Sequence, residues 1–197
     1  MPHPGFLRPC EHLHALLPLG YPYFSLLPPY SIVVAQPRHL HALPAIELAA
    51  ARLLEGHAPG SVLLETTHLE TFAAAVNDGR LWIALFEDVP VGFALVRMLA
   101  DDLPHLEEMD VLPSHGRRGL GTALVRTVCE WASSSRYSMI TLTTFRAVAF
   151  NFPFYARMGF VEIPGQELRP ELVAVVSEEA TRGLSPESRA VMAYRCA

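Results

Sequence analysis

The chain has 197 residues, of which 51% are hydrophobic and 18% charged, and its formal net charge is −5. This composition is typical of one soluble globular domain and excludes a disordered chain. All 15 basic residues are arginines, and only Arg117 and Arg118 are adjacent. Such dispersed positive charge does not predict a nucleic-acid surface. No segment reaches the ~18 apolar residues that cross a bilayer, so we also expect no membrane partner.

The first 30 residues differ from the rest, because they hold seven of the 17 prolines. No cationic segment precedes the proline-free stretch around Glu11, which is atypical of a secretory signal peptide. We therefore expect a cytoplasmic protein with a proline-rich arm at 1–30 and one domain at 31–197. The arm packs on the domain, on the second subunit of a homodimer, or on nothing, and the sequence leaves these alternatives open.

Cysteines and histidines do not predict a metal site. The three cysteines, Cys10, Cys129 and Cys196, are far apart and lack the spacing of a zinc site or a disulfide framework. Histidine pairs at 12/14 and 39/41 could ligate a metal if the chain is extended there, but neither pair shows the spacing of a known metal motif. We expect no metal, and Cys129 is expected to be a small buried hydrophobe.

Hydrophobic periodicity predicts alternating strands and helices from Ser31 onward. In chain order we expect a strand at 31–35, a helix at 37–54, a helix from Leu69 to Val76, strands at 81–86 and 91–98 around a hairpin turn at 87–90, a strand at 105–111, a helix with an apolar stripe from Leu120 to Trp131, a strand at 137–145, a helix around Tyr155, a strand from Phe160, a helix at 172–181 and a strand at 189–195. This order indicates a mixed α/β fold whose crossover at 105–145 joins one parallel strand pair.

The segment from Val111 to Thr122, VLPSHGRRGLGT, joins an apolar strand to a long amphipathic helix. Its three glycines permit close approach of a ligand, and the first N–H groups of the helix are unpaired, so the segment predicts a pyrophosphate site. A P-loop is excluded because the chain has no lysine. A Rossmann fingerprint fits poorly, because Leu124 occupies the third glycine position and residues 141–143 read Thr-Leu-Thr where an acid is expected.

A second motif follows the next strand and reads NFPFYARMGF over residues 151–160. Together with the loop, it resembles motifs A and B of the GCN5-related N-acetyltransferases (GNAT), which bind acetyl-CoA at a Q/R-x-x-G-x-G/A loop and carry Phe-Tyr-x-x-x-Gly-Phe on the next helix. The resemblance extends from about Ser31 to the C-terminus. It implies a GNAT-type α/β fold, with a mixed, mostly antiparallel central sheet flanked by helices.

The resemblance also implies the residues that bind acetyl-CoA, the expected co-substrate. The strand before the loop offers the backbone of Met109, Asp110 and Val111 to the pantetheine arm. The Gln or Arg that opens the family's loop motif is replaced here by Gly116. A guanidinium at that end of the pyrophosphate therefore comes from Arg117 or Arg118, or is absent. Asn151 either contacts the cofactor or caps its own helix. The loop residues implied in binding are Gly116, Arg117, Arg118, Gly119, Leu120, Gly121 and Thr122.

Three residues are implied in catalysis. Tyr155 occupies the position of the family's general acid, which protonates the CoA thiolate. The alternative role of Tyr155 is packing beside Phe154. His105 and Glu107 stand where serotonin-type acetyltransferases have His-Leu-His and other members have glutamate. Strand alternation places both side chains on one face, and Glu108 on the other unless a bulge intervenes. The alternative is that His105 and Glu107 are a solvent-exposed pair at the edge of the sheet, without a catalytic role.

The acidic residues beside this strand favour a small cationic acceptor. They are Asp101, Asp102, Glu107, Glu108 and Asp110. The sequence therefore predicts an N-acetyltransferase that acts on the primary amine of a small molecule by direct attack, without a covalent enzyme intermediate. The alternative is a non-catalytic acyl-CoA-binding regulatory module on the same fold.

Overall fold

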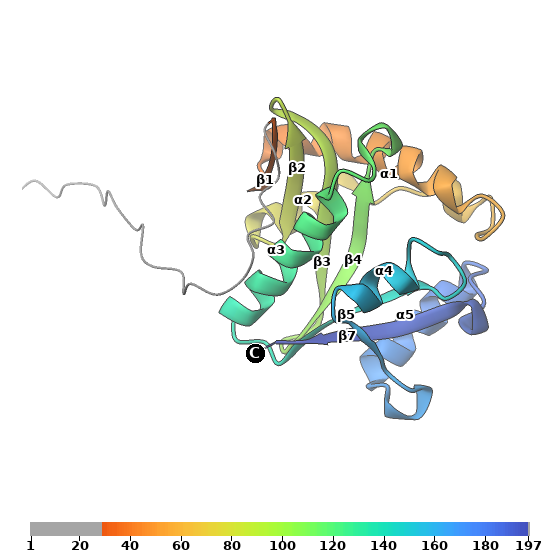
Figure 1. Ribbon diagram of the computed structural model, residues 1–197. Helices are drawn as coiled ribbons and strands as arrows, with labels where there is room; N and C mark the ends of the chain where they lie inside the picture. Colours follow the sequence, from red (N-terminus) through yellow and green to blue (C-terminus); the bar gives the residue numbers. More distant parts are fainter. Residues whose placement is uncertain (1–28, 197) are drawn as a thin grey trace, which may run out of the picture.

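The computed structural model describes residues 29–196 and contains one central sheet (Figure 1). Among these residues the sheet has seven strands in the order β1-β2-β3-β4-β5-β7-β6. Only β4 and β5 pair in parallel, which confirms the predicted mixed, mostly antiparallel sheet with one crossover. The strands are β1 (Tyr30–Val34), β2 (Leu81–Phe86), β3 (Val89–Ala100), β4 (Leu103–Val111), β5 (Met139–Phe145), β6 (Val161–Glu162) and β7 (Arg189–Arg195).

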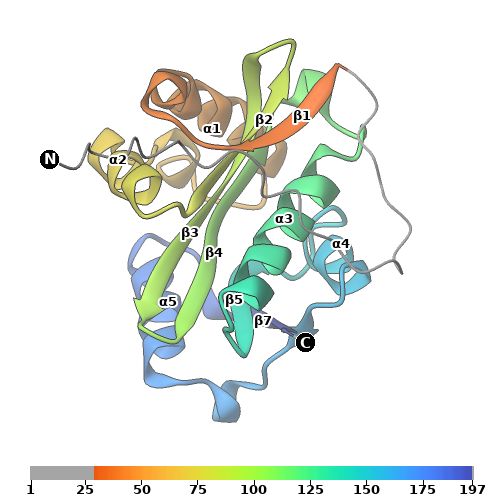
Figure 2. The ribbon, with the colours of Figure 1, turned by 90° about the vertical axis from the view of Figure 1, so that its left-hand side faces the viewer.

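Helices cover both faces of the sheet. Helices α3 and α4 lie on one face, and α1, α2 and α5 lie on the other (Figure 2). Across the described part of the chain, no helix is long and apolar enough to cross a membrane. The helices are α1 (Leu43–Ala51), α2 (Leu69–Asn77), α3 (Leu120–Ser134), α4 (Phe152–Arg157) and α5 (Pro170–Thr181), with 3-10 turns η1 (Pro37–Ala42), η2 (Arg52–Leu54), η3 (Val62–Leu64), η4 (Pro113–His115), η5 (Gly165–Glu167) and η6 (Pro186–Ser188).

Several strands and helices differ from the predicted bounds by one or two residues, and two regions differ more. The single helix expected at 37–54 consists of η1, α1 and η2, because Pro44 lies in the first turn of α1, where its missing N–H is tolerated but a continuous helix is not. The hairpin turn is tighter than expected. Glu87 and Asp88 have φ angles of 47° and 67° and form a two-residue turn, so Val89 and Pro90 belong to β3.

Apolar side chains from the predicted stripes form the cores on the two faces. Under α3, Leu120, Leu124 and Val128 are buried against the sheet, and Cys129 is buried beside them as expected. Under α1 and α2, the rings of Phe72 and Phe93 meet edge to face at 5.4 Å. Both cores hold β3 and β4 rigidly between two helical layers.

The parallel pair β4 and β5 separates soon after it forms. Only His105 with Thr141 and Leu106 with Leu142 are paired. Beyond them β4 pairs only with β3, and β5 only with β7. The backbone edge of residues 107–111 therefore has no neighbouring strand, and the fold opens there (Figure 1).

Candidate active site

A bulge in β4 determines which way its acidic side chains face. Glu108 pairs with Leu95 of β3, and Leu106 already pairs with the next residue, Val96, so Glu107 is an extra residue. Leu106 and Met109 both pack against the α3 cluster. Glu107 and Glu108 therefore both face the other side of the sheet. Strict alternation, which placed Glu108 opposite Glu107, is wrong here for this reason.

A cavity of about 1550 Å³ runs along the opening between β4 and β5. It is lined by β4, the start of α3, α4, α1 and the segment that follows α1. All but one of the residues expected from the sequence line it: His105, Glu107, Met109, Asp110, Val111, Gly116, Arg117, Gly119, Leu120, Gly121, Thr122, Asn151 and Tyr155. The exception is Arg118.

The loop before α3 presents backbone N–H groups to one end of this cavity. Gly119 has a left-handed φ of 84° and immediately precedes α3, a conformation that glycine adopts without strain. No side chain caps the helix. The first N–H groups of α3, on Leu120, Gly121 and Thr122, lack partners within the helix. This end of the cavity is therefore suited to an anion.

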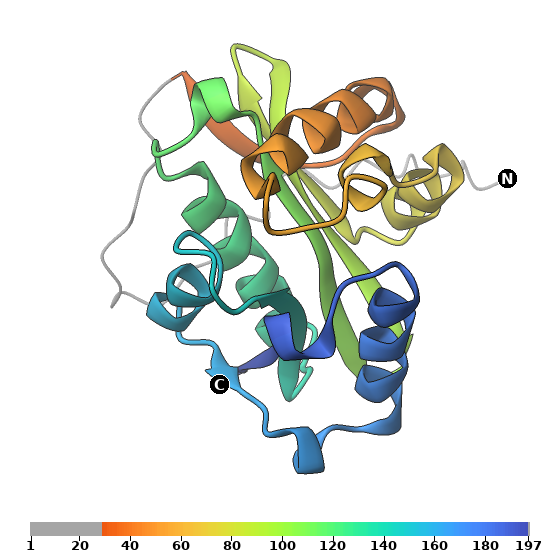
Figure 3. The same cartoon turned by 90° about the vertical axis from the view of Figure 1, so that its right-hand side faces the viewer.

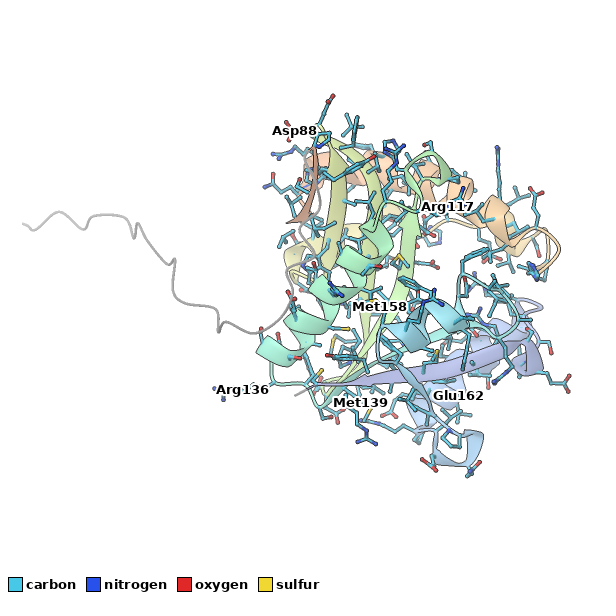
Figure 4. All side chains as sticks on the ribbon, viewed as in Figure 1. Asp88, Arg117, Arg136, Met139, Met158 and Glu162 are labelled. Atoms are coloured by element: carbon cyan, nitrogen blue, oxygen red, sulfur yellow. The ribbon has the colours of Figure 1, made fainter. Side chains whose placement is uncertain are left out.

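The two adjacent arginines of the loop have different positions. Arg117 lines the cavity beside the start of α3 (Figure 4) and has a positive φ of 57°. Arg118 instead lies over the ring of Tyr30, with its Cζ 6.0 Å from the ring centroid. The hydroxyl of Tyr30 is 2.9 Å from Nδ1 of His115, which fixes this side of the loop. Of these two arginines, only Arg117 lines the cavity.

Tyr155 lies on α4 and packs between Phe154 and Phe160, with ring centroids 5.0 Å and 5.7 Å away. Its hydroxyl makes no hydrogen bond with the described residues. Burial, together with the negative charges of Asp110 and Glu108, raises the pKa of this phenol. The hydroxyl therefore keeps its proton at neutral pH, which is the state that a general acid requires.

Two carboxyl groups on β4, those of Glu108 and Asp110, face the cavity without an ion pair or hydrogen bond among residues 29–196. Burial, followed by the nearby acids Asp110, Glu47 and Glu107, raises the pKa of Glu108 well above its usual range. Burial and Glu47 raise the pKa of Asp110 to about 8. Asp110 can therefore exchange a proton near neutral pH, and Glu108 holds a proton more readily than an exposed glutamate does.

His105 is 2% exposed and lies where β4 and β5 are still paired. The hydroxyl of Thr141 donates to the carbonyl of Pro104 at 3.2 Å, so His105 Nδ1–H donates to that hydroxyl oxygen at 2.9 Å. Burial, with the charges of Arg97 and Arg189, lowers the pKa of His105 to about 3. The imidazole is therefore neutral and weakly basic.

Glu107 already has a charged partner, because Arg97 Nη1 donates to its Oε1 at 3.3 Å. Burial raises the pKa of Glu107, and Arg97 opposes that rise. Arg97 also pairs with Glu178 of α5 at 3.2 Å. The Glu107 carboxylate thus belongs to an ion-pair group that joins β4 to α5.

Asn151 precedes α4, and its side chain makes no capping hydrogen bond there. It lines the cavity instead. Within residues 29–196, no group of three or more His, Cys, Asp or Glu side chains is arranged to hold a metal ion. His39 is buried and its Nδ1 accepts the Gln36 N–H at 3.1 Å. His12 and His14 lie outside the described residues.

Comparisons with known proteins agree with this fold. The model of the acetyltransferase (GNAT) family matches residues 47–160, more than half of the chain. The chain therefore belongs to the GNAT acetyltransferase family.

Solved structures with the same fold include the PaiA N-acetyltransferase from Thermoplasma acidophilum in complex with coenzyme A, with 14% identity, a TM-score of 0.65, and 84% of this chain and 98% of that one covered. The ribosomal-protein-S18-alanine N-acetyltransferase from Escherichia coli has 18% identity and a TM-score of 0.59, with 85% and 94% covered. The N-acetylglutamate synthase from Neisseria gonorrhoeae, complexed with coenzyme A and N-acetyl-glutamate, has 18% identity and a TM-score of 0.62, with 85% and 35% covered.

Proposed function

We propose that this chain transfers the acetyl group of acetyl-CoA to the primary amine of a small cationic acceptor. One observation carries the proposal. A single cavity joins an uncapped helix start, suited to pyrophosphate, to a protonated phenol with two unpaired carboxyl groups beside it. Family membership and the coenzyme A bound to similar folds support acetyl-CoA as the donor.

In the donor half, the pyrophosphate binds the N–H groups of Leu120, Gly121 and Thr122, and Arg117 pairs with a phosphate oxygen. The pantetheine arm lies along the open edge of β4. Met109, Asp110 and Val111 pair with β3 on one side, and among the described residues they have no partner strand on the side of β5. Extended ligands add to such an edge through main-chain hydrogen bonds.

In the acceptor half, Glu108 takes a proton from the ammonium, and the free amine attacks the thioester carbonyl. The N–C bond forms, the C–S bond breaks, and the phenol of Tyr155 gives its proton to the leaving thiolate. The second proton that the nitrogen loses on becoming an amide restores the phenol through water. Direct attack requires no covalent enzyme intermediate. The sequence favoured His105 and Glu107 as the base, but a neutral, weakly basic imidazole and a carboxylate bound to Arg97 are poorer proton acceptors than Glu108.

Charge favours a cationic acceptor. The four arginines that line the cavity outside the loop and α4 all have carboxylate partners: Arg80 with Asp78, Arg97 with Glu107 and Glu178, Arg182 with Glu65, and Arg189 with Glu179. Glu108 and Asp110 retain no such partner within residues 29–196. In their ionised form these groups attract a cation, and this attraction weakens with ionic strength, since the Debye length is ~10 Å at 0.1 M salt.

A free-thiol assay with acetyl-CoA against amines, amino acids, polyamines and aminoglycosides tests this function. Thiol release that depends on an amine, with an acceptor KM that rises with salt, is expected. Calorimetric binding of CoA without thiol release from any acceptor would instead support a non-catalytic acyl-CoA-binding module. Best use of a neutral or acidic acceptor, with no effect of salt, would contradict the cationic class.

A further inference from the structure

Residues 52–66, which we call the strap, leave the end of α1 and cross the acceptor end of the cavity. The strap contains η2 and η3 and leads to α2. Figure 3 views the molecule from the side on which the strap and the end of α5 face one another. Because α1 lies against β3 and β4, and the strap contacts Phe145 of β5 and the residues that follow α5, the strap joins the two sides of the opening between β4 and β5.

Contacts at several points hold the strap in place. Arg182, just after α5, donates through Nε to Oε2 of Glu65 at 2.8 Å. Gly183 lies so close to the strap that an added Cβ would meet Pro59 at 3.2 Å. Thr67, just beyond the strap, bonds to the buried Glu47 of α1 through its hydroxyl at 2.6 Å. The strap is therefore a fixed wall of the cavity.

The inner side of the strap is apolar. Its residues Leu54, Ala58 and Val62 pack against a cluster on the opposite arm that contains Phe145, Val148 and Leu184. Leu54, Ala58, Val62 and the neighbouring Leu63 all line the cavity. An acceptor at this end therefore meets hydrocarbon on one side and the β4 carboxyl groups on the other.

Several polar groups of the cavity have no partner among the described residues and are open to an acceptor. Burial and the negative charge of Asp110 raise the pKa of Glu108, and burial and Glu47 raise the pKa of Asp110, so the two carboxyl groups resist carrying two negative charges at once. Thr144 is 2% exposed and lines the same cavity, and its Oγ1 has no hydrogen-bond partner within the described residues. Buried hydroxyls nearly always find a partner, so this one points to a group that a ligand supplies.

We propose that the acceptor is a small primary monoamine with an apolar body, bound with its ammonium at Glu108 and Asp110 and its hydrocarbon under the strap. The inference rests on the proposed acetyl transfer, because it assigns the acceptor half of the same cavity. It makes diamines and polyamines poorer acceptors, because a second ammonium next to Leu54, Ala58 and Val62 of the strap would lose its hydration.

Hexylamine and 1,6-diaminohexane form a matched test, because they differ only in whether the far end is a methyl group or a second ammonium. We expect kcat/KM for hexylamine to exceed that for the diamine at least tenfold, as expected for ~1.4 kcal/mol of apolar burial. A peptide with a free N-terminus should be used less well than hexylamine. Preference for the diamine, or equal use of the peptide, would overturn the proposal.

Two adjacent leucines of the strap provide a matched pair of variants. Leu63 lines the cavity, whereas Leu64 does not and is 78% exposed. Leu63→Ser should raise the KM for hexylamine about tenfold, with little change for ethylamine and none for acetyl-CoA. Leu64→Ser should change none of these values. Equal effects of both variants would contradict a hydrocarbon site under the strap.

Failure of acetyl transfer and failure of this inference can be told apart by binding. If no amine releases thiol, calorimetry on the CoA-loaded protein compares hexylamine with 1,6-diaminohexane. Tighter binding of hexylamine, weakened by Leu63→Ser, would support the monoamine site although the proposed reaction had failed. Tighter binding of the diamine, or binding of neither amine, would overturn the site itself.

Discussion

Leu106 and Met109 lie three positions apart on β4, yet both side chains pack against the apolar cluster under α3. Residues at an odd separation in a regular strand face opposite sides. The extra residue Glu107 reverses the alternation and brings Glu108 to the cavity beside it. The partners of these two acids, rather than strand alternation, therefore distinguish their roles.

We expect Glu108→Gln to lower kcat about 100-fold or more, because the amide keeps the shape of the side chain but cannot accept a proton. Glu107→Gln should lower kcat less than about tenfold, since that carboxylate is already bound to Arg97. Steady-state kinetics with a saturating amine measure both. A larger effect at Glu107 would return the role of base to that residue.

Tyr155→Phe should lower kcat by about 100-fold or more, because only the leaving thiolate requires the phenolic proton. The phenylalanine ring preserves the contacts with Phe154 and Phe160. The Kd of CoA, measured by calorimetry, should therefore be unchanged. Full turnover of this variant would assign Tyr155 to packing and would contradict its role as the general acid.

Arg117→Ala should raise the Kd of CoA about fivefold at low salt, as expected for loss of about 1 kcal/mol from an exposed phosphate contact. The difference should shrink as salt is added. Arg118→Ala serves as the matched control, because that side chain lies over Tyr30 and does not line the cavity. The opposite order of the two effects would mean that Arg118 reaches the pyrophosphate.

Asp110 should make the stability of the protein depend on pH. Its pKa is about 8 in the fold and about 3.9 when unfolded. The contribution of the protonated Asp110 carboxyl to the free energy of unfolding is thus fully present below pH ~4. It is lost as pH rises through about 8. Asp110→Asn should therefore gain Tm relative to the parent between pH 5 and 8, by about 2–4 °C if the gain is ~1 kcal/mol. A Tm difference that does not vary with pH would contradict the raised pKa.

Much of the fold follows from local patterns. The strand at 189–195 has the bounds expected from its residues, and the crossover forms the one parallel pair as predicted. The order β5-β7-β6 was not predictable, because β7 inserts between strands that precede it in the chain. Such pairing depends on contacts between distant residues, which periodicity does not report.

The candidate site, too, could be predicted from the sequence only in part. The glycines of the loop and Tyr155 could be found from short motifs, because their chemistry depends on neighbours in the sequence. The bulge at Glu107 could not, because a single inserted residue is defined only by its pairing with β3. The ion pair of Glu65 with Arg182 joins residues 117 positions apart, so the strap's role required the structure as well.

Product stoichiometry in the presence of acetyl-CoA and a small primary amine tests the central claim most directly. Mass spectrometry should detect one N-acetylated amine for each thiol released, and no acetylated protein when the amine is omitted. Glu108→Gln and Tyr155→Phe should both suppress this product while CoA still binds. Release of thiol without an N-acetylated product, or an acetylated protein that forms before the product, would contradict direct transfer from acetyl-CoA to the amine.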